Sequence, residues 1–148
     1  MASIRREVPI ERSADDVWNA LRDVGQLHTR LVPGFVVDCR LEPGARVVTF
    51  ANGMVARELI VDVDDATRRV AWAVVDGRPT HHNASAQALP AGDGACRVVW
   101  IADVLPDELA AGMAGMIEHG LAAMKRTLEG GATTGMTMAA TNGPRANR

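Results

Sequence analysis

The sequence predicts an α+β fold that combines an antiparallel sheet of seven strands with one long C-terminal helix. Stretches of alternating apolar and polar residues are separated by short turn signals such as Asn52-Gly53 and Asp76-Gly77, a pattern typical of antiparallel hairpins. Residues 107–129 carry apolar side chains at helical spacing. The chain has 148 residues, 47% of them hydrophobic and 23% charged, which suits one domain.

The first elements are a strand and two short helices. Residues 4–10 alternate and predict an edge strand, because Pro9 has no N–H to donate to a neighbouring strand. A helix is expected to begin at Ser13, whose hydroxyl accepts a hydrogen bond from the backbone N–H near Asp16. A second short helix is predicted at 26–31.

Six further strands follow, and their short connections predict an antiparallel meander. We expect them at residues 35–42, 45–51, 54–64, 68–76, 79–89 and 95–104. The long helix should start at Pro106, since proline is tolerated at a helix start, and end at Gly130-Gly131. Residues 130–148 contain little apolar surface and predict a flexible tail, which leaves one domain over 1–129.

Composition and spacing exclude several classes of function. A net charge of −2 gives no basic surface for nucleic acid. The chain shows no apolar run long enough for a membrane helix and no signal peptide, so we predict no integral membrane association and a cytoplasmic location. His81 and His82 are neighbours on a strand and point to opposite faces, so they do not chelate one ion. With no glycine-rich phosphate loop either, we predict no metal and no cofactor.

The order of elements resembles the helix-grip fold of the START-like, Bet v 1-like superfamily (SRPBCC), which includes the polyketide cyclase/dehydrase-like proteins. The resemblance is carried by residues 10–18 (IERSADDVW), by Val98-Val99-Trp100 and by the amphipathic helix at 107–129. It implies a curved sheet that grips the long helix around a cavity for an apolar ligand.

Hairpin parity predicts which side chains face that cavity, because directly opposed residues share a face of the sheet. The 52–53 turn and the 65–68 loop place Arg57 inward, opposite Asp76. A three-residue loop at 77–79 adds Thr80 to this row and puts His82 one layer deeper, whereas a two-residue turn there would point His81 inward instead. The opposite face is expected to carry Asp38, Arg40, Glu58, Asp62, His81, Asn83, Gln87, Arg97 and Asp103.

The candidate ligand-binding side chains combine this polar row with large apolar groups of the wall. They are Arg57, Trp72, Asp76, Thr80, His82, Trp100, Met113 and Met116. Trp100 is expected opposite Ala84. Polar groups on an apolar wall are costly unless they are paired, so Arg57 and Asp76 form either a structural ion pair or an anchor for a ligand.

Three functions are compatible with this arrangement. The first is binding of a small hydrophobic ligand (lipid, polyketide or isoprenoid-like) in a carrier or sensor role, favoured because the sequence offers no nucleophile–base pair. The second is a polyketide cyclase, aromatase or dehydratase, in which His82 would polarise a carbonyl or move a proton. The third is a protein-interaction module. Whether the chain is an enzyme, and whether it forms a homodimer, stays open.

Overall fold

The computed structural model describes residues 2–130 and contains the predicted strands and helices. The strands are β1 (Ala2–Ile10), β2 (Val36–Glu42), β3 (Ala45–Phe50), β4 (Val55–Asp64), β5 (Arg69–Val75), β6 (His81–Pro90) and β7 (Cys96–Leu105). The helices are α1 (Ala14–Leu21), the π-helix η1 (Leu27–Leu31), the 3-10 turn η2 (Asp107–Leu109) and α2 (Ala110–Gly130). The predicted tail lies, apart from Gly130, outside the described residues.

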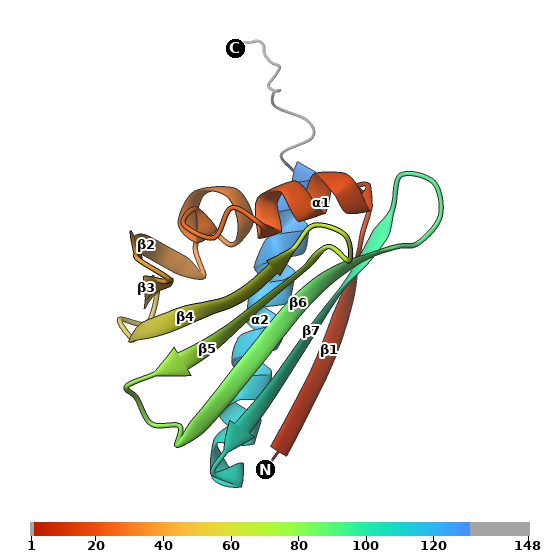
Figure 1. The fold of residues 1–148 in the computed structure, drawn as a ribbon. Helices are drawn as coiled ribbons and strands as arrows, with labels where there is room; N and C mark the ends of the chain where they lie inside the picture. Colours follow the sequence, from red (N-terminus) through yellow and green to blue (C-terminus); the bar gives the residue numbers. More distant parts are fainter. Residues whose placement is uncertain (1, 131–148) are drawn as a thin grey trace.

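The seven strands form one antiparallel sheet in the order β1-β7-β6-β5-β4-β3-β2. The sheet curves around α2, while α1 and η1 lie across one end of it (Figure 1). β1 pairs with β7, so the first strand is an edge strand as expected. The arrangement confirms the helix-grip architecture.

The start of α1 follows from local chemistry. The Ser13 hydroxyl accepts the N–H of Asp16 at 3.1 Å, as predicted. The indole N–H of Trp18 and the guanidinium of Arg22 both donate to Asp65, at 2.8 and 2.9 Å. These bonds hold α1 against the turn between β4 and β5, and α1 thereby closes that end of the sheet.

α2 lies against the concave side of the sheet through a buried apolar stripe that includes Ile117, Leu121 and Met124. The Lys125 ammonium donates to the carbonyl of Pro9 at 2.7 Å, which ties the helix to β1. At Gly120 the helix comes so close to the sheet that a Cβ would lie 2.8 Å from Cζ3 of Trp100.

The register between β3 and β4 differs from the predicted one by a single residue. Phe50 N–H donates to the carbonyl of Met54 at 2.8 Å, and Gly53 has a φ of +90°. The hairpin therefore closes with the three-residue loop 51–53, a length that favours glycine in the left-handed region. Because a one-residue shift turns every side chain to the other face, the predicted positions of Arg57 inside and Glu58 outside are wrong.

Two further hairpins show how far parity can be trusted. A bulge between Ile60 and Asp62 shifts β4 against β5, so Arg57 lies opposite Val75 and not opposite Asp76. The β6–β7 hairpin is shifted by two residues, which places Trp100 opposite Ala86 in place of Ala84 and leaves it on the predicted face. The pairing between β5 and β6 is as predicted, with Trp72 opposite Ala84.

Candidate functional site

A cavity of about 580 Å³ lies between the sheet and α2. Most of its lining is apolar, and the part that α1 and η1 close is fully buried. The buried apolar lining residues are Leu21, Leu27, Leu31, Val32, Val36, Val48, Ala56, Val70, Trp72, Ala86, Ala102, Ile117 and Met124. A concave, largely apolar space of this volume with a few polar groups is the usual form of a small-molecule site.

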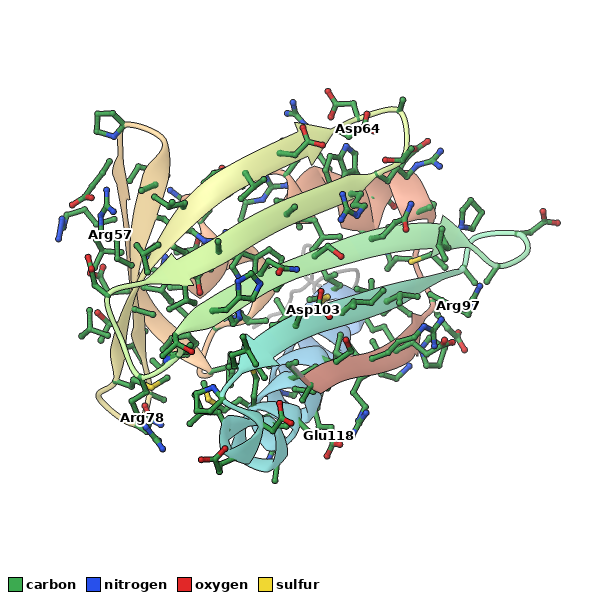
Figure 2. The ribbon with its side chains drawn as sticks, turned by 60° about the horizontal axis from the view of Figure 1, so that its bottom comes forward. Arg57, Asp64, Arg78, Arg97, Asp103 and Glu118 are labelled. Atoms are coloured by element: carbon green, nitrogen blue, oxygen red, sulfur yellow. The ribbon has the colours of Figure 1, made fainter. Side chains whose placement is uncertain are left out.

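The exposed lining residues mark where the cavity opens. They come from three segments: the β3–β4 turn with Asn52, Met54 and Val55, the β5–β6 loop with Asp76 to Arg78, and η2 and the start of α2 with Glu108 and Gly112. Figure 2 shows Arg78 at the tip of the β5–β6 loop. The opening is therefore rimmed by side chains of both charges, and its wall on the helix side is built from Leu109, Gly112 and the methionines 113 and 116.

A buried ion pair forms the polar part of the cavity wall. Arg46 on β3 and Glu58 on β4 lie directly opposite each other, and Nε of Arg46 donates to Oε1 of Glu58 at 2.8 Å. The two residues are only 3% and 6% exposed. Nη1 of Arg46 donates to the carbonyl of Val24 at 3.2 Å, and its Cζ lies 5.4 Å from the centre of the Trp72 ring. The guanidinium is thus fixed by a carboxylate, a carbonyl and an aromatic face.

His82 provides the second polar group. It lies at the position where β5 and β6 separate, and its Nδ1 accepts the N–H of Val74 at 3.1 Å. A neutral ring that accepts at Nδ1 carries its proton on Nε2. Burial lowers the pKa of the His82 imidazole, and its neighbour His81 lowers it further. The wall therefore offers a neutral imidazole with one N–H to donate.

These groups form one row across the sheet. Arg46 is paired with Glu58, Glu58 is paired with Val74, and Val74 is bonded to the ring of His82. Paired strands lie about 4.8 Å apart, so Glu58 on β4 lies next to Val74, while the hydrogen bond from the Val74 N–H holds the His82 ring on the β6 side. The row presents an acceptor and donors to the same side of the cavity.

Of the eight side chains predicted from the sequence, six line the cavity. They are Trp72, Asp76, His82, Trp100, Met113 and Met116. The rings of Trp72 and Trp100 meet edge to face with centres 5.7 Å apart. Asp76 lies at the rim and has no bond to Arg57, so the predicted pair does not form.

Arg57 and Thr80 do not line the cavity. The Arg57 side chain is 41% exposed, points away from the concave side (Figure 2) and donates to Glu42 at 3.1 Å. Thr80 is exposed, and its N–H donates to the carbonyl of Leu105 at 2.9 Å. His81 is exposed, as the three-residue loop predicts, and contacts the side-chain oxygen of Asn83 at 2.6 Å.

Sequence reasoning missed Arg46 and Glu58. Arg46 could have been found, because the Pro43-Gly44 turn correctly places it opposite Leu41 on the cavity face. Glu58 could not, because its direction depends on whether the next turn closes with two residues or three.

Other kinds of site find no support within residues 2–130. No group of three or more His, Cys, Asp or Glu side chains in this part of the chain is placed to hold a metal ion. No helix among these residues is long and apolar enough to cross a membrane. Cys39 and Cys96 are both buried and free.

Comparisons with known proteins agree with this description. The family described as polyketide cyclase / dehydrase and lipid transport matches residues 1–129. A comparison with curated proteins finds no match.

Three solved structures show the same fold. An uncharacterized protein from Bacillus thuringiensis is 18% identical, with a TM-score of 0.77 over 86% of this chain and 98% of that one. Norcoclaurine synthase from Thalictrum flavum is 20% identical, with a TM-score of 0.67 over 92% and 96%. The di-domain ARO/CYC protein BexL from the BE-7585A biosynthetic pathway is 17% identical, with a TM-score of 0.76 over 87% of this chain and 47% of that one. At these identities the likeness extends to the fold alone.

Proposed function

This chain belongs to the polyketide cyclase/dehydrase and lipid transport family, and we propose that it binds a small, mainly hydrophobic ligand in the cavity between the sheet and α2. A lipid, a polyketide or an isoprenoid-like molecule has the required chemistry, and the role is that of a carrier or sensor. The observation that carries the proposal is the cavity of about 580 Å³ with an apolar wall and a single polar row.

The geometry favours binding over covalent chemistry. The polar lining groups are Arg46, Glu58 and His82 in the row, with Asn52, Asp76, Arg78 and Glu108 at the rim. No serine, threonine or cysteine side chain is part of this lining, so among the described residues the cavity has no hydroxyl or thiol nucleophile. Met113 and Met116 give the helix side of the wall an adaptable surface, which suits ligands of variable shape.

Native mass spectrometry tests the proposal directly. Protein purified without denaturation should carry a small molecule that is released when the protein unfolds. Binding of the apolar dye 1-anilinonaphthalene-8-sulfonate provides a second measurement.

A matched pair of variants shows whether that dye enters the cavity. Ala86→Phe places a ring into the cavity, because Ala86 lines it opposite Trp100, whereas Gln87→Phe places the same ring on the other face of β6. We expect Ala86→Phe to weaken dye binding by about tenfold or more, and Gln87→Phe to leave it unchanged; tenfold corresponds to about 1.4 kcal/mol. Equal affinities in the two variants, with no molecule co-purifying, would contradict the proposal.

A second candidate function is a cyclase- or dehydratase-type reaction in the same cavity, and His82 is the observation that favours it. The Nε2–H of a neutral imidazole is suited to polarise a carbonyl group, and burial, which lowers the pKa of the His82 ring, favours this neutral form. If a poly-β-keto thioester is cyclised by the wild type and not by His82→Gln, while both bind it, the protein is an enzyme and the carrier hypothesis is wrong. If the wild type binds this thioester without cyclising it, the carrier hypothesis stands.

A further inference from the structure

The stability of the sheet does not by itself explain why the pair of Arg46 and Glu58 is buried. Moving two charges out of water costs free energy that their attraction only partly returns, so a buried pair is weak evidence for stability. The exposed pair of Arg57 and Glu42 joins strands of the same sheet without that cost. The position of the buried pair on the wall of the cavity therefore calls for an explanation beyond packing.

Each partner of the buried pair keeps one atom without a hydrogen bond. Arg46 uses Nε and Nη1, and Glu58 uses Oε1, so within residues 2–130 Nη2 and Oε2 have no partner. Neither atom is fully buried. Within residues 2–130, Nδ1 of His28 is the polar side-chain atom that is fully buried and has no hydrogen-bond partner, so the unpartnered Nη2 and Oε2 must be accessible. Since both residues line the cavity, a donor and an acceptor face its interior side by side.

We propose that this pair is the subsite for the polar end of the ligand and that it selects a hydroxyl group, an uncharged group that both accepts from Nη2 of Arg46 and donates to Oε2 of Glu58. The inference rests on the proposed ligand-binding function and names the class of ligand: a mainly apolar molecule that ends in an alcohol or phenol. The aromatic wall of Trp72, which stacks on the same guanidinium, lies beside this end of the ligand.

The charges of the pair exclude the two other kinds of polar end. A carboxylate close enough to accept from Nη2 would lie beside the Glu58 carboxylate in a site sheltered from water, where like charges repel strongly. An ammonium group that donates to Oε2 would meet the Arg46 guanidinium in the same way. An ether or ester accepts from Nη2 but leaves Oε2 without a donor, which is costly for a buried charged acceptor. A hydroxyl reproduces both hydrogen bonds that a water molecule makes at such a place.

Four octyl compounds that differ only in their polar end provide the probes: 1-octanol, methyl octyl ether, octanoate and octylammonium. Their binding is followed by intrinsic tryptophan fluorescence, because Trp72 and Trp100 line the cavity and none of the probes absorbs in that range. The wild type should bind 1-octanol about tenfold more tightly than methyl octyl ether, the effect expected of one hydrogen bond to a charged group. It should bind the two ions more weakly still.

Charge-removing variants then move the preference in opposite directions. Glu58→Gln keeps an acceptor for Nε of Arg46 but removes the negative charge, so octanoate should gain about tenfold relative to 1-octanol. Arg46→Met should favour octylammonium by the same argument. Glu42→Gln is the control, because it makes the same change in the exposed pair with Arg57, and it should leave all four affinities as in the wild type.

One double variant protects the test against misfolding. Arg46→Met combined with Glu58→Met replaces the pair by apolar side chains, a change that is often neutral or stabilising, and it should abolish the preference for 1-octanol over the ether. An unchanged preference in this variant overturns the subsite. Equal binding of all four probes by the wild type, with loss of binding in Ala86→Phe, overturns the subsite and leaves the proposed function intact, whereas no binding of any probe overturns both.

Discussion

α2 approaches the sheet closely at Gly120, and replacing this residue by alanine should destabilise the protein. A Cβ at this position would lie 2.8 Å from Cζ3 of Trp100 and 3.2 Å from Cε2 of Phe35. Both contacts are to aromatic rings, so relieving them requires a whole ring to shift and not merely the end of a flexible side chain. Overpacking of this kind typically costs about 1–3 kcal/mol.

The matched control is Gly115→Ala in the same helix. A Cβ at Gly115 meets no atom within 4 Å, and replacing a glycine within a helix by alanine contributes about 0.5–1 kcal/mol. The same gain in helix propensity applies at Gly120, so it cancels in the comparison. The difference in unfolding free energy between the two variants therefore isolates the strain, about 1–3 kcal/mol in favour of Gly115→Ala.

Urea denaturation followed by circular dichroism at the helix band measures this difference without relying on Trp100 fluorescence. Gly120→Ala should also weaken binding of the apolar dye, because the displaced Trp100 ring moves into the cavity that it lines. Two variants of equal stability would show that α2 does not approach the sheet as closely as described, and that the cavity is wider at this point.

Two further predictions concern the cavity wall. Trp100→Ala should cost less than the roughly 3–5 kcal/mol expected for a fully packed tryptophan, because one side of this ring faces the cavity. Denaturation in urea would contradict this if the loss of stability lay within that range, as for a ring packed on all sides. Burial lowers the pKa of His82, and protonation at Nδ1 would break its bond to Val74. The unfolded chain therefore takes up this proton first as the pH falls through about 6.5, and stability should decline from there until the pH has fallen through the lowered pKa of the folded state. His82→Gln should flatten that decline in urea titrations at several pH values, and parallel profiles for wild type and variant would contradict the assignment.

The elements of this fold could be predicted because the signals for them are local. The alternation of strands, the Ser13 cap and the helical turn after Pro106 each depend on residues within one turn or one strand. The long α-helix itself begins at Ala110, after the 3-10 turn η2, and not at Pro106 as predicted. The faces of β5, β6 and β7 were also predictable, because the register between β5 and β6 is the expected one and the later error of two residues preserves parity. The face of β4 was not, since its direction depends on a loop closure and on a bulge that leave no mark in the sequence.

A physical argument that goes beyond parity does select the observed register of β4. The predicted register turns Val55, Arg57 and Leu59 inward and sets Arg46 opposite Leu59. Arg57 would then have Asp76 as its partner, but Arg46 would lie on an apolar wall with no carboxylate opposite it. The observed register turns Ala56, Glu58 and Ile60 inward and leaves Val55 and Leu59 partly exposed.

The two effects can be compared in magnitude. Exposing Val55 and Leu59 costs about 2 kcal/mol of apolar burial. A fully buried aliphatic side chain contributes about 1.5–3 kcal/mol, and the burial of Ala56 and Ile60 offsets part of the loss. An uncompensated buried charge costs about 3–5 kcal/mol. Pairing Arg46 with Glu58 therefore outweighs the lost burial, and the choice that stabilises the register also places a donor and an acceptor on the wall of the cavity. The polar row of the proposed ligand site follows from the way in which the sheet avoids a buried, unpaired arginine.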